Sequence, residues 1–144
     1  MRKSSIASIA AVLALTACGA DPTEQALIAA IDRLEAAGEA RDVDGFMDNV
    51  GDDFAGNGTE LDQKGLERYL RLLAMRHQAI GVTRAATQVD ISGDRAVVKM
   101  QILLTGGAGG LLPESGQLLD TESTWRFVDG DWQLAGARWK PAGH

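Results

Sequence analysis

TWRFVDGDWQL, residues 124–134, is the stretch of sequence that decides the fold. Two strand-like runs, 117–128 and 132–139, meet at Asp129-Gly130-Asp131, and an Asp-Gly pair in that position is a strong signal for a tight hairpin. The runs 82–90 and 96–104 are joined in the same way by Ser92-Gly93-Asp94. The C-terminal half therefore predicts two antiparallel hairpins, which a glycine-rich link over 105–116 connects.

The N-terminal half shows helical spacing instead. Asp21, Pro22 and Glu24 have the pattern of an N-cap, a first helical residue and a capping-box glutamate, which predicts a helix over 22 to about 40. The apolar face of this helix consists of Leu27, Ile28, Ile31 and Leu34.

Two more helices are expected before the strands begin. The first covers 43–50 behind an Asp42 cap, and the segment 52–59 after it suits an irregular turn or a short edge strand. The next helix starts after Asp62 and has a broad set of apolar residues: Leu66, Tyr69, Leu70, Leu72, Leu73, Met75 and Ile80. Such breadth predicts burial around much of its circumference.

Helices followed by a meander of strands predict an α+β domain over 22–141, with the helices on one face of the sheet. Besides this order of elements, the chain has a turn after Asp52-Asp53-Phe54 and a last hairpin that runs through Gly130-Asp131-Trp132 to Arg138-Trp139. In these three features it resembles the nuclear transport factor 2-like superfamily, in particular its SnoaL-like bacterial members. The resemblance implies a cone-like fold in which three N-terminal helices pack on a curved, mainly antiparallel β-sheet around a pocket. Members of that superfamily include isomerases, dehydratases and cyclases as well as accessory binding proteins, and many dimerise through the sheet.

The first 21 residues indicate export and lipidation. Arg2 and Lys3 precede an apolar run over 6–15, which at about ten residues is too short to cross a bilayer and predicts a signal peptide over 1–17. Leu15-Thr16-Ala17-Cys18 resembles a bacterial lipobox, which implies acylation of Cys18, palmitate included, and a short tether over 18–21. An ordinary secretory signal with a free thiol is the alternative. Glycine rather than aspartate at position 19 favours the outer membrane in a Gram-negative host.

Charge and cysteine content exclude several classes of protein. Loss of Arg2 and Lys3 with the signal would take the formal charge from −6 to −8, which argues against a nucleic-acid partner and against attraction of the whole chain to anionic lipid. Membrane contact is therefore expected through acyl chains on Cys18. One cysteine allows no internal disulfide, and with two histidines it forms no metal-ligand cluster, so no metal or cofactor is predicted.

Strand alternation sorts the candidate site residues by sheet face. We expect the core or pocket wall on the face that carries Val98, Met100, Ile102, Leu104, Leu119, Thr121, Ser123, Trp125 and Phe127. The opposite face carries Asp120 and Glu122, which would be paired carboxylates for acid–base chemistry if that face lined the pocket, and otherwise form a solvated or dimer-facing set.

The candidate ligand-binding residues are Tyr69, His77, Met100, Trp125 and Arg138, and no catalytic residue is assigned. His77 would act as a base only if it pointed into the cone, and near a helix C-terminus it would otherwise complement the helix dipole. The aromatic residues either stack on a flat ligand or pack the core.

The sequence leaves two alternatives open for a pair of arginines and two for the glycine-rich link. Arg84 and Arg138 would bind an anion together if both faced a cavity, or would pair across strands with acidic residues, namely Asp90, Asp120 or Glu122. Leu111 and Leu112 lie at the tip of the glycine-rich link, which is either a mobile lip over a pocket or a plain connection.

Three functional hypotheses follow. The first is a membrane-anchored, periplasm-facing lipoprotein whose non-catalytic cone binds a small apolar ligand or a partner protein. The second is a SnoaL-like enzyme acting by proton transfer, with Asp120, Glu122, His77 or Tyr69 as its acid–base groups. The third is an interaction module that forms a homodimer through the exposed sheet face.

Overall fold

The computed structural model of the chain describes residues 21–58, 60–107 and 115–143. The predicted signal peptide, Cys18 and the leucines at 111 and 112 lie outside these ranges. The described elements are α1 (Glu24–Glu39), α2 (Val43–Met47), β1 (Val50–Gly56), β2 (Leu61–Asp62), α3 (Gln63–Arg76), β3 (Ala79–Ser92), β4 (Arg95–Gly107), β5 (Ser115–Val128) and β6 (Asp131–Pro141).

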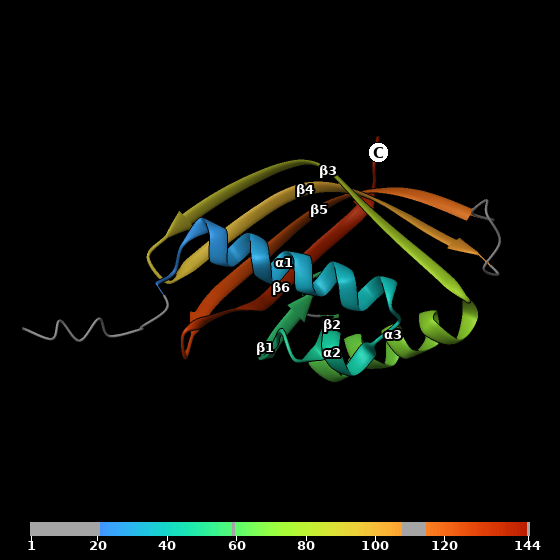
Figure 1. Cartoon of the computed structure of the whole chain (residues 1–144), viewed down its shortest axis with the longest axis horizontal. Helices are drawn as coiled ribbons and strands as arrows, with labels where there is room; N and C mark the ends of the chain where they lie inside the picture. The colour runs from blue at the N-terminus through green and yellow to red at the C-terminus, as the bar shows by residue number, and fades with distance from the viewer. Residues whose placement is uncertain (1–20, 59, 108–114, 144) are drawn as a thin grey trace, which may run out of the picture.

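The six strands form one sheet in the order β2-β1-β6-β5-β4-β3. Strands β3 to β6 pair antiparallel in sequence, so both predicted hairpins are confirmed, while β1 runs parallel to β6. The turn residues Gly93, Asp129 and Gly130 have positive φ, as tight hairpin turns require. The sheet is strongly bent, and α1 lies across its concave side (Figure 1). The α+β class and the curved, helix-backed sheet are thereby confirmed.

Helix boundaries correct the sequence prediction in two places. The N-cap of α1 is Thr23, whose hydroxyl accepts the amide proton of Ala26, and the predicted cap Asp21 lies two residues outside it. Helix α2 ends at Met47, and Val50 already belongs to β1. A turn or an edge strand was expected in this region, but β1 is paired on both sides, with β2 and with β6. The early end of α2 arises because pairing with β6 extends the chain at Val50.

The core lies between α1 and the half of the sheet near the β3–β4 and β5–β6 turns. Its buried residues are Leu27, Ala30, Ile31, Leu34, Val50, Phe54, Leu66, Ala96, Val98, Trp125, Trp132 and Leu134. Trp132 is 1% exposed and meets Phe127 edge to face at a centroid distance of 5.3 Å. Apolar burial of this kind is the main source of stability in a chain without disulfides.

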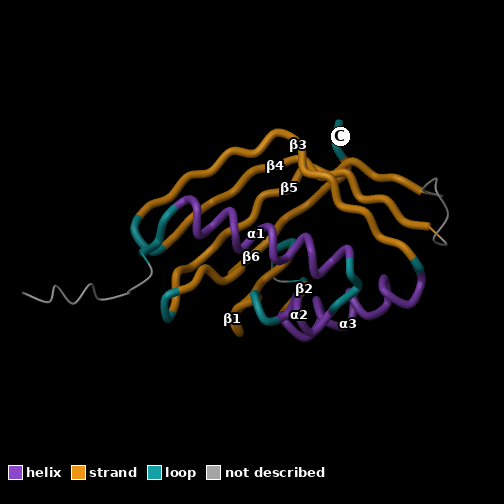
Figure 2. The backbone as a smooth tube through the Cα atoms, viewed as in Figure 1, coloured by secondary structure: helices purple, strands orange, loops and turns teal. Residues whose placement is uncertain are grey.

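Helix α3 differs most from its prediction. Only Gly65 and Leu66 are buried in it, and Met75 is 77% exposed, so the expected burial around most of its circumference is wrong. The reason is its position: α3 contacts β1, β2 and α2 at the edge of the molecule, and its C-terminal half extends past them toward the start of β3 (Figure 2).

Candidate ligand-binding site

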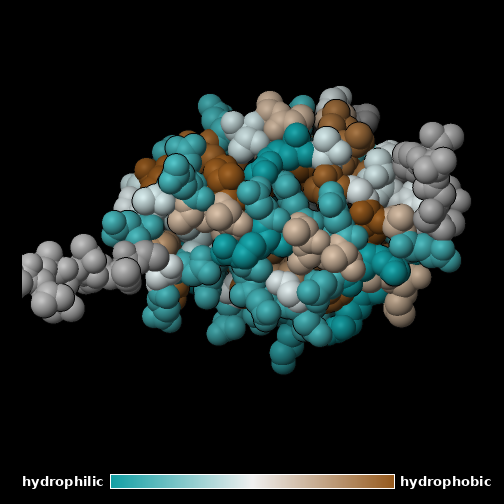
Figure 3. Space-filling view, viewed as in Figure 1, coloured by the Kyte–Doolittle hydropathy of each residue, from teal (hydrophilic) through white to brown (hydrophobic). Residues whose placement is uncertain are grey.

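The concave face of the sheet continues beyond the core as an apolar surface. We call this surface the open end; its residues are Ile80, Val82, Ile102, Leu104 and Leu119. Cross-strand pairing places Val82 opposite Leu104 and Ile102 opposite Leu119, on the face that also carries core residue Val98. None of these described side chains belongs to the core cluster, and all but Leu119 are half-buried. In Figure 3 hydrophobic side chains gather between α1 and the bent part of β3.

Met100 and Trp125 both face the concave side, as the alternation predicts, but at different depths. Trp125 is 3% exposed, and its indole Nε1–H donates to Ser123 Oγ at 2.8 Å, so it is a core residue with a satisfied polar group. Met100 is half-buried and pairs with Thr121, four register positions nearer the open end than the pair of Ala96 and Trp125. Met100 therefore borders the open end, whereas Trp125 lies within the core cluster.

His77 and Tyr69 separate on α3. His77 is the C-cap residue, and its ring lies against the backbone of Gly106 at the end of β4, where an added Cβ would come within 2.7 Å of Nδ1. This contact puts His77 beside the open end. Tyr69 is 44% exposed on the outer surface of the helix.

The two arginines lie on opposite faces of the sheet. Arg138 is on the outer face and donates to Glu122 at 2.6 Å, the cross-strand partner that the sequence offered as one alternative. Arg84 is on the concave face, where it pairs with Asp32 at 2.5 Å and with Glu35 at 3.3 Å on α1. The hypothesis that both guanidiniums face one cavity is wrong, because α1 covers only the concave face. The strand partners expected for Arg84 are also wrong.

Glu35 is a residue that the sequence analysis missed. Its Oε1 is buried and, among the described residues, accepts no hydrogen bond. Burial raises the pKa of this carboxyl above its ordinary value; Arg84 opposes that change, while Asp32 and Glu39 add to it. Its spacing from Ile28 and Ile31, at i+7 and i+4, was the signal that its side chain borders the buried face of α1.

A polar groove of about 640 Å³ lies on the outer face, where β6 extends past the end of β1. It is lined by Asn57, Lys99, Asp120, Thr121, Glu122, Arg138, Trp139 and Lys140. Asn57 Oδ1 accepts the backbone N–H of Trp139, which holds the β1–β2 turn against β6. Asn57, Lys99 and Lys140 were not singled out from the sequence, since only pairing across β1, β4 and β6 brings them together.

Both carboxylates proposed for acid–base work line this outer groove, away from the open end. Asp120 Oδ1 accepts from the Gln101 amide at 2.8 Å. Hydrogen bonding to Arg138 lowers the pKa of Glu122, so Glu122 is an ionised partner in an ion pair. Their placement on the outer face agrees with the alternative of a solvated set, and dimerisation through this face stays a prediction.

Among residues 21–58, 60–107 and 115–143 there is no group of three or more His, Cys, Asp or Glu side chains arranged to hold a metal ion. The same part of the chain contains no helix with the length and apolar character needed to cross a membrane.

No family model matches the sequence, and no curated protein matches it. The fold, however, is similar to many solved structures. A provisionally assigned dehydratase of the NTF2-like family from Streptomyces avermitilis superimposes with a TM-score of 0.71 at 17% identity, over 83% of this chain and 96% of that one. An NTF2-like protein of unknown function from Pseudomonas putida gives 0.70 at 17% identity, over 81% and 84%.

Bd1075 of Bdellovibrio bacteriovorus also gives a TM-score of 0.71, at 13% identity, over 81% of this chain and 41% of that one. Identities this low carry the fold and not the activity. The chain has the nuclear transport factor 2-like fold.

Proposed function

We propose that this chain is a lipoprotein anchored in the membrane through acylated Cys18 and facing the periplasm, and that its cone-like domain binds a small apolar molecule at the open end without catalysing a reaction. The signal-like segment and the lipobox-like sequence at 15–18 support the anchor. The apolar surface beyond the core supports the binding site.

The observation that carries the binding proposal is the composition of the open end. Its five side chains are aliphatic and share the concave face, and all but Leu119, which is 5% exposed, are half-buried. Ligand sites in proteins are typically concave and mostly apolar with a few polar groups at the rim. Here the rim carries His77, beside Gly106, and Glu39, whose Oε1 accepts the backbone N–H of Val82 at 3.2 Å.

The placement of the acid–base candidates favours binding over catalysis. Proton transfer requires groups within hydrogen-bond reach of one substrate. Asp120 and Glu122 lie on the outer face, Tyr69 projects from the exposed side of α3, and His77 alone borders the open end. These four groups therefore do not form a constellation around one substrate.

Two neighbouring leucines give a matched test of the binding site. Leu104 lies at the open end, and Leu103 lies on the outer face opposite Leu118. We expect Leu104→Asp to abolish the fluorescence that the neutral apolar dye N-phenyl-1-naphthylamine gains on binding, and Leu103→Asp to retain it. Circular dichroism checks that both variants fold. Equal dye binding by both variants, or none by the unaltered protein, would contradict the site.

The anchor is tested separately in cells. Cys18→Ser should abolish incorporation of radiolabelled palmitate and move the protein out of membranes that are washed with high salt, which removes electrostatic contacts. Palmitate incorporation or salt-resistant membrane fractionation that survives this substitution would refute the anchor and leave the dye experiment unaffected.

A further inference from the structure

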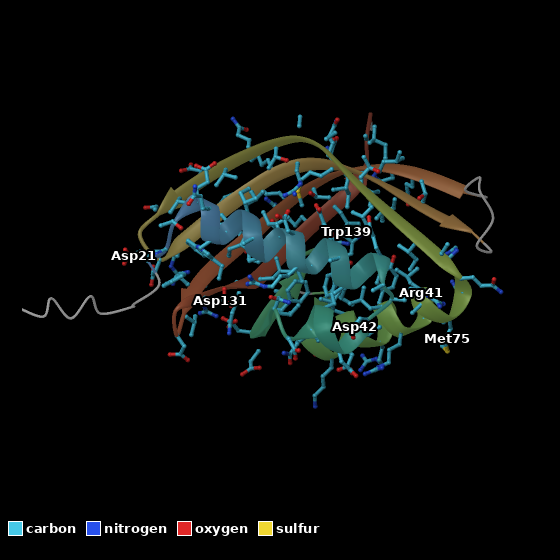
Figure 4. The ribbon with its side chains drawn as sticks, in the orientation of Figure 1. Asp21, Arg41, Asp42, Met75, Asp131 and Trp139 are labelled. Atoms are coloured by element: carbon cyan, nitrogen blue, oxygen red, sulfur yellow. The ribbon has the colours of Figure 1, made fainter. Side chains whose placement is uncertain are left out.

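Helix α3 presents apolar side chains that the domain does not cover. Tyr69 is 44% exposed, Leu72 39% and Met75 77%. They occur at i, i+3 and i+6, so they form an oblique stripe that turns about 60° around the helix at each step and leads from the side of buried Leu66, at Tyr69, to the opposite side of the helix, at Met75. In Figure 4 Met75 lies on the underside of the molecule and points away from the sheet.

Cations surround this stripe. Helix α3 contains Lys64, Arg68, Arg71 and Arg76 against the single acid Glu67, a formal charge of +3 in a chain of −6. Arg71 is occupied by Glu67 and Asp44, at 2.7 and 2.9 Å. Lys64, Arg68 and Arg76 are exposed, and among the described residues no ion pair involves them.

The geometry of the helix interleaves the two kinds of side chain. Positions four apart are rotated by about 40° around a helix axis, so Arg68 and Arg76 lie on either side of Leu72. A surface of this kind, with apolar side chains flanked by arginine and lysine, is typical of helices that lie in the headgroup region of a membrane. We call Lys64, Arg68, Tyr69, Leu72, Met75 and Arg76 the α3 surface.

We propose that the α3 surface docks on a bilayer that contains anionic phospholipid, with its apolar stripe in the interface and its cations at the headgroups. Charge complementarity selects this occupant, because a patch of +3 on an otherwise acidic protein attracts an anionic surface locally while the rest of the chain is repelled. The net charge of the whole chain predicts no such attraction, because it does not show that the cations are concentrated on α3.

The proposed lipid anchor would keep the α3 surface within reach of the membrane, and to that extent docking rests on the proposed function. Asp21, where the described chain begins, and Met75 lie toward opposite ends of the long axis (Figure 4). Contacts at both ends would hold the domain along the bilayer rather than upright on it.

Vesicle binding of the unlipidated segment 19–144 tests docking without the anchor. All residues of the core cluster fall between 27 and 134, so this segment contains the whole described fold. We expect it to sediment with vesicles of phosphatidylcholine and phosphatidylglycerol, to bind pure phosphatidylcholine at least about ten-fold more weakly, and to dissociate as salt rises.

A charge-matched pair of variants locates the contact. Arg68→Glu with Arg76→Glu should weaken binding to the anionic vesicles at least about ten-fold. Arg95→Glu with Lys140→Glu changes the net charge equally at exposed positions on β4 and β6, and should leave most of the binding intact. Equal losses in the two double variants would overturn the proposal, as would absence of binding by the unaltered segment.

Insertion of the stripe is measured by fluorescence. Because the segment has no cysteine, Met75→Cys provides a single site for an environment-sensitive label, and Ser92→Cys at the end of β3 provides the control. Anionic vesicles should shift the emission of the label at position 75 to the blue and leave the label at 92 unchanged. Light scattering adds a further outcome: a dimer that Leu72→Ser with Met75→Ser converts to a monomer, without vesicle binding, would assign the stripe to a second copy and overturn docking.

Discussion

The guanidinium of Arg41 donates hydrogen bonds to the carbonyl oxygens of His77, at 3.0 Å, and Ala74, at 3.1 Å. Arg41 lies in the α1–α2 connection, so these bonds tie the end of α1 to the C-terminus of α3, where carbonyl groups lack helical partners. The same contact holds His77 at the open end. One arginine thus links the fold of the first helix to the position of the candidate site.

Loss of this link should loosen the last turn of α3. We expect Arg41→Ala to lower the free energy of unfolding by about 1 kcal/mol and to accelerate amide exchange near His77. Arg41 has a left-handed φ of 55°, which glycine adopts freely, so Arg41→Gly should cost less than Arg41→Ala. Chemical denaturation and hydrogen exchange measure both effects, and unchanged exchange near His77 in both variants would contradict the role assigned to Arg41.

The observed and the predicted caps of α1 can be distinguished directly. Thr23→Ala should cost about 1 kcal/mol, because the hydroxyl that accepts the Ala26 amide proton is removed. Asp21→Ala should change stability by less than about 0.5 kcal/mol, because Asp21 is exposed and lies outside the helix. Thermal unfolding of the two variants under one condition gives the comparison, and a larger cost at position 21 would restore the cap predicted from sequence.

Glu35 should make stability fall as pH rises above the ordinary carboxyl value of 4.5. Its pKa is raised in the folded state, so folding favours the protonated form, and that contribution is complete below 4.5 and lost as pH rises through the folded pKa. Glu35→Gln should remove this part of the pH dependence. Denaturation at a series of pH values detects it, with Asp32→Asn as the control on the same ion pair.

Arg84→Met should raise the pKa of Glu35 still further. It removes the cation that opposes the raised pKa of Glu35, so the carboxyl titrates at a still higher pH. Carbon-13 NMR of the carboxyl measures the titration, and a fall in the pKa would show that Arg84 does not stabilise the ionised form.

On the outer face, Arg138→Met should raise the pKa of Glu122 toward its ordinary value, because the hydrogen bond to Arg138 is the largest cause of its lowering. The Lys99 amino group is 3.9 Å away, compared with 2.6 Å for Arg138, so Lys99→Met should raise it less. Folding favours ionised Glu122, so its contribution to stability is complete above pH 4.5 and is lost as pH falls through the lower pKa of the folded state. NMR titration gives the order of the two shifts, and the reverse order would contradict the assignment.

Several parts of the fold were predictable because their causes are local. Asp129-Gly130 and Ser92-Gly93 impose hairpins through backbone conformation, and alternation along β4 and β5 assigns Met100 and Trp125 to one face. The third helix begins where Asp62 predicts, with its carboxylate accepting the Gly65 amide proton.

Other parts depend on contacts between distant segments. Nothing near Val50 indicates that this strand pairs in parallel with β6, and nothing near Arg84 indicates that its partners lie on α1. The candidate site shares this dependence: Met100 and His77 meet the open end, while Arg138 lies across the sheet from it.

The sequence by itself determined the two hairpins, the approximate positions of the three helices and which strand residues share a face, since periodicity and turn chemistry act over a few residues. Only the tertiary structure decided that β1 pairs in parallel with β6 and how much of α3 is buried. Burial depends on the surface that a neighbouring element supplies, and for Leu72 and Met75 the fold supplies none.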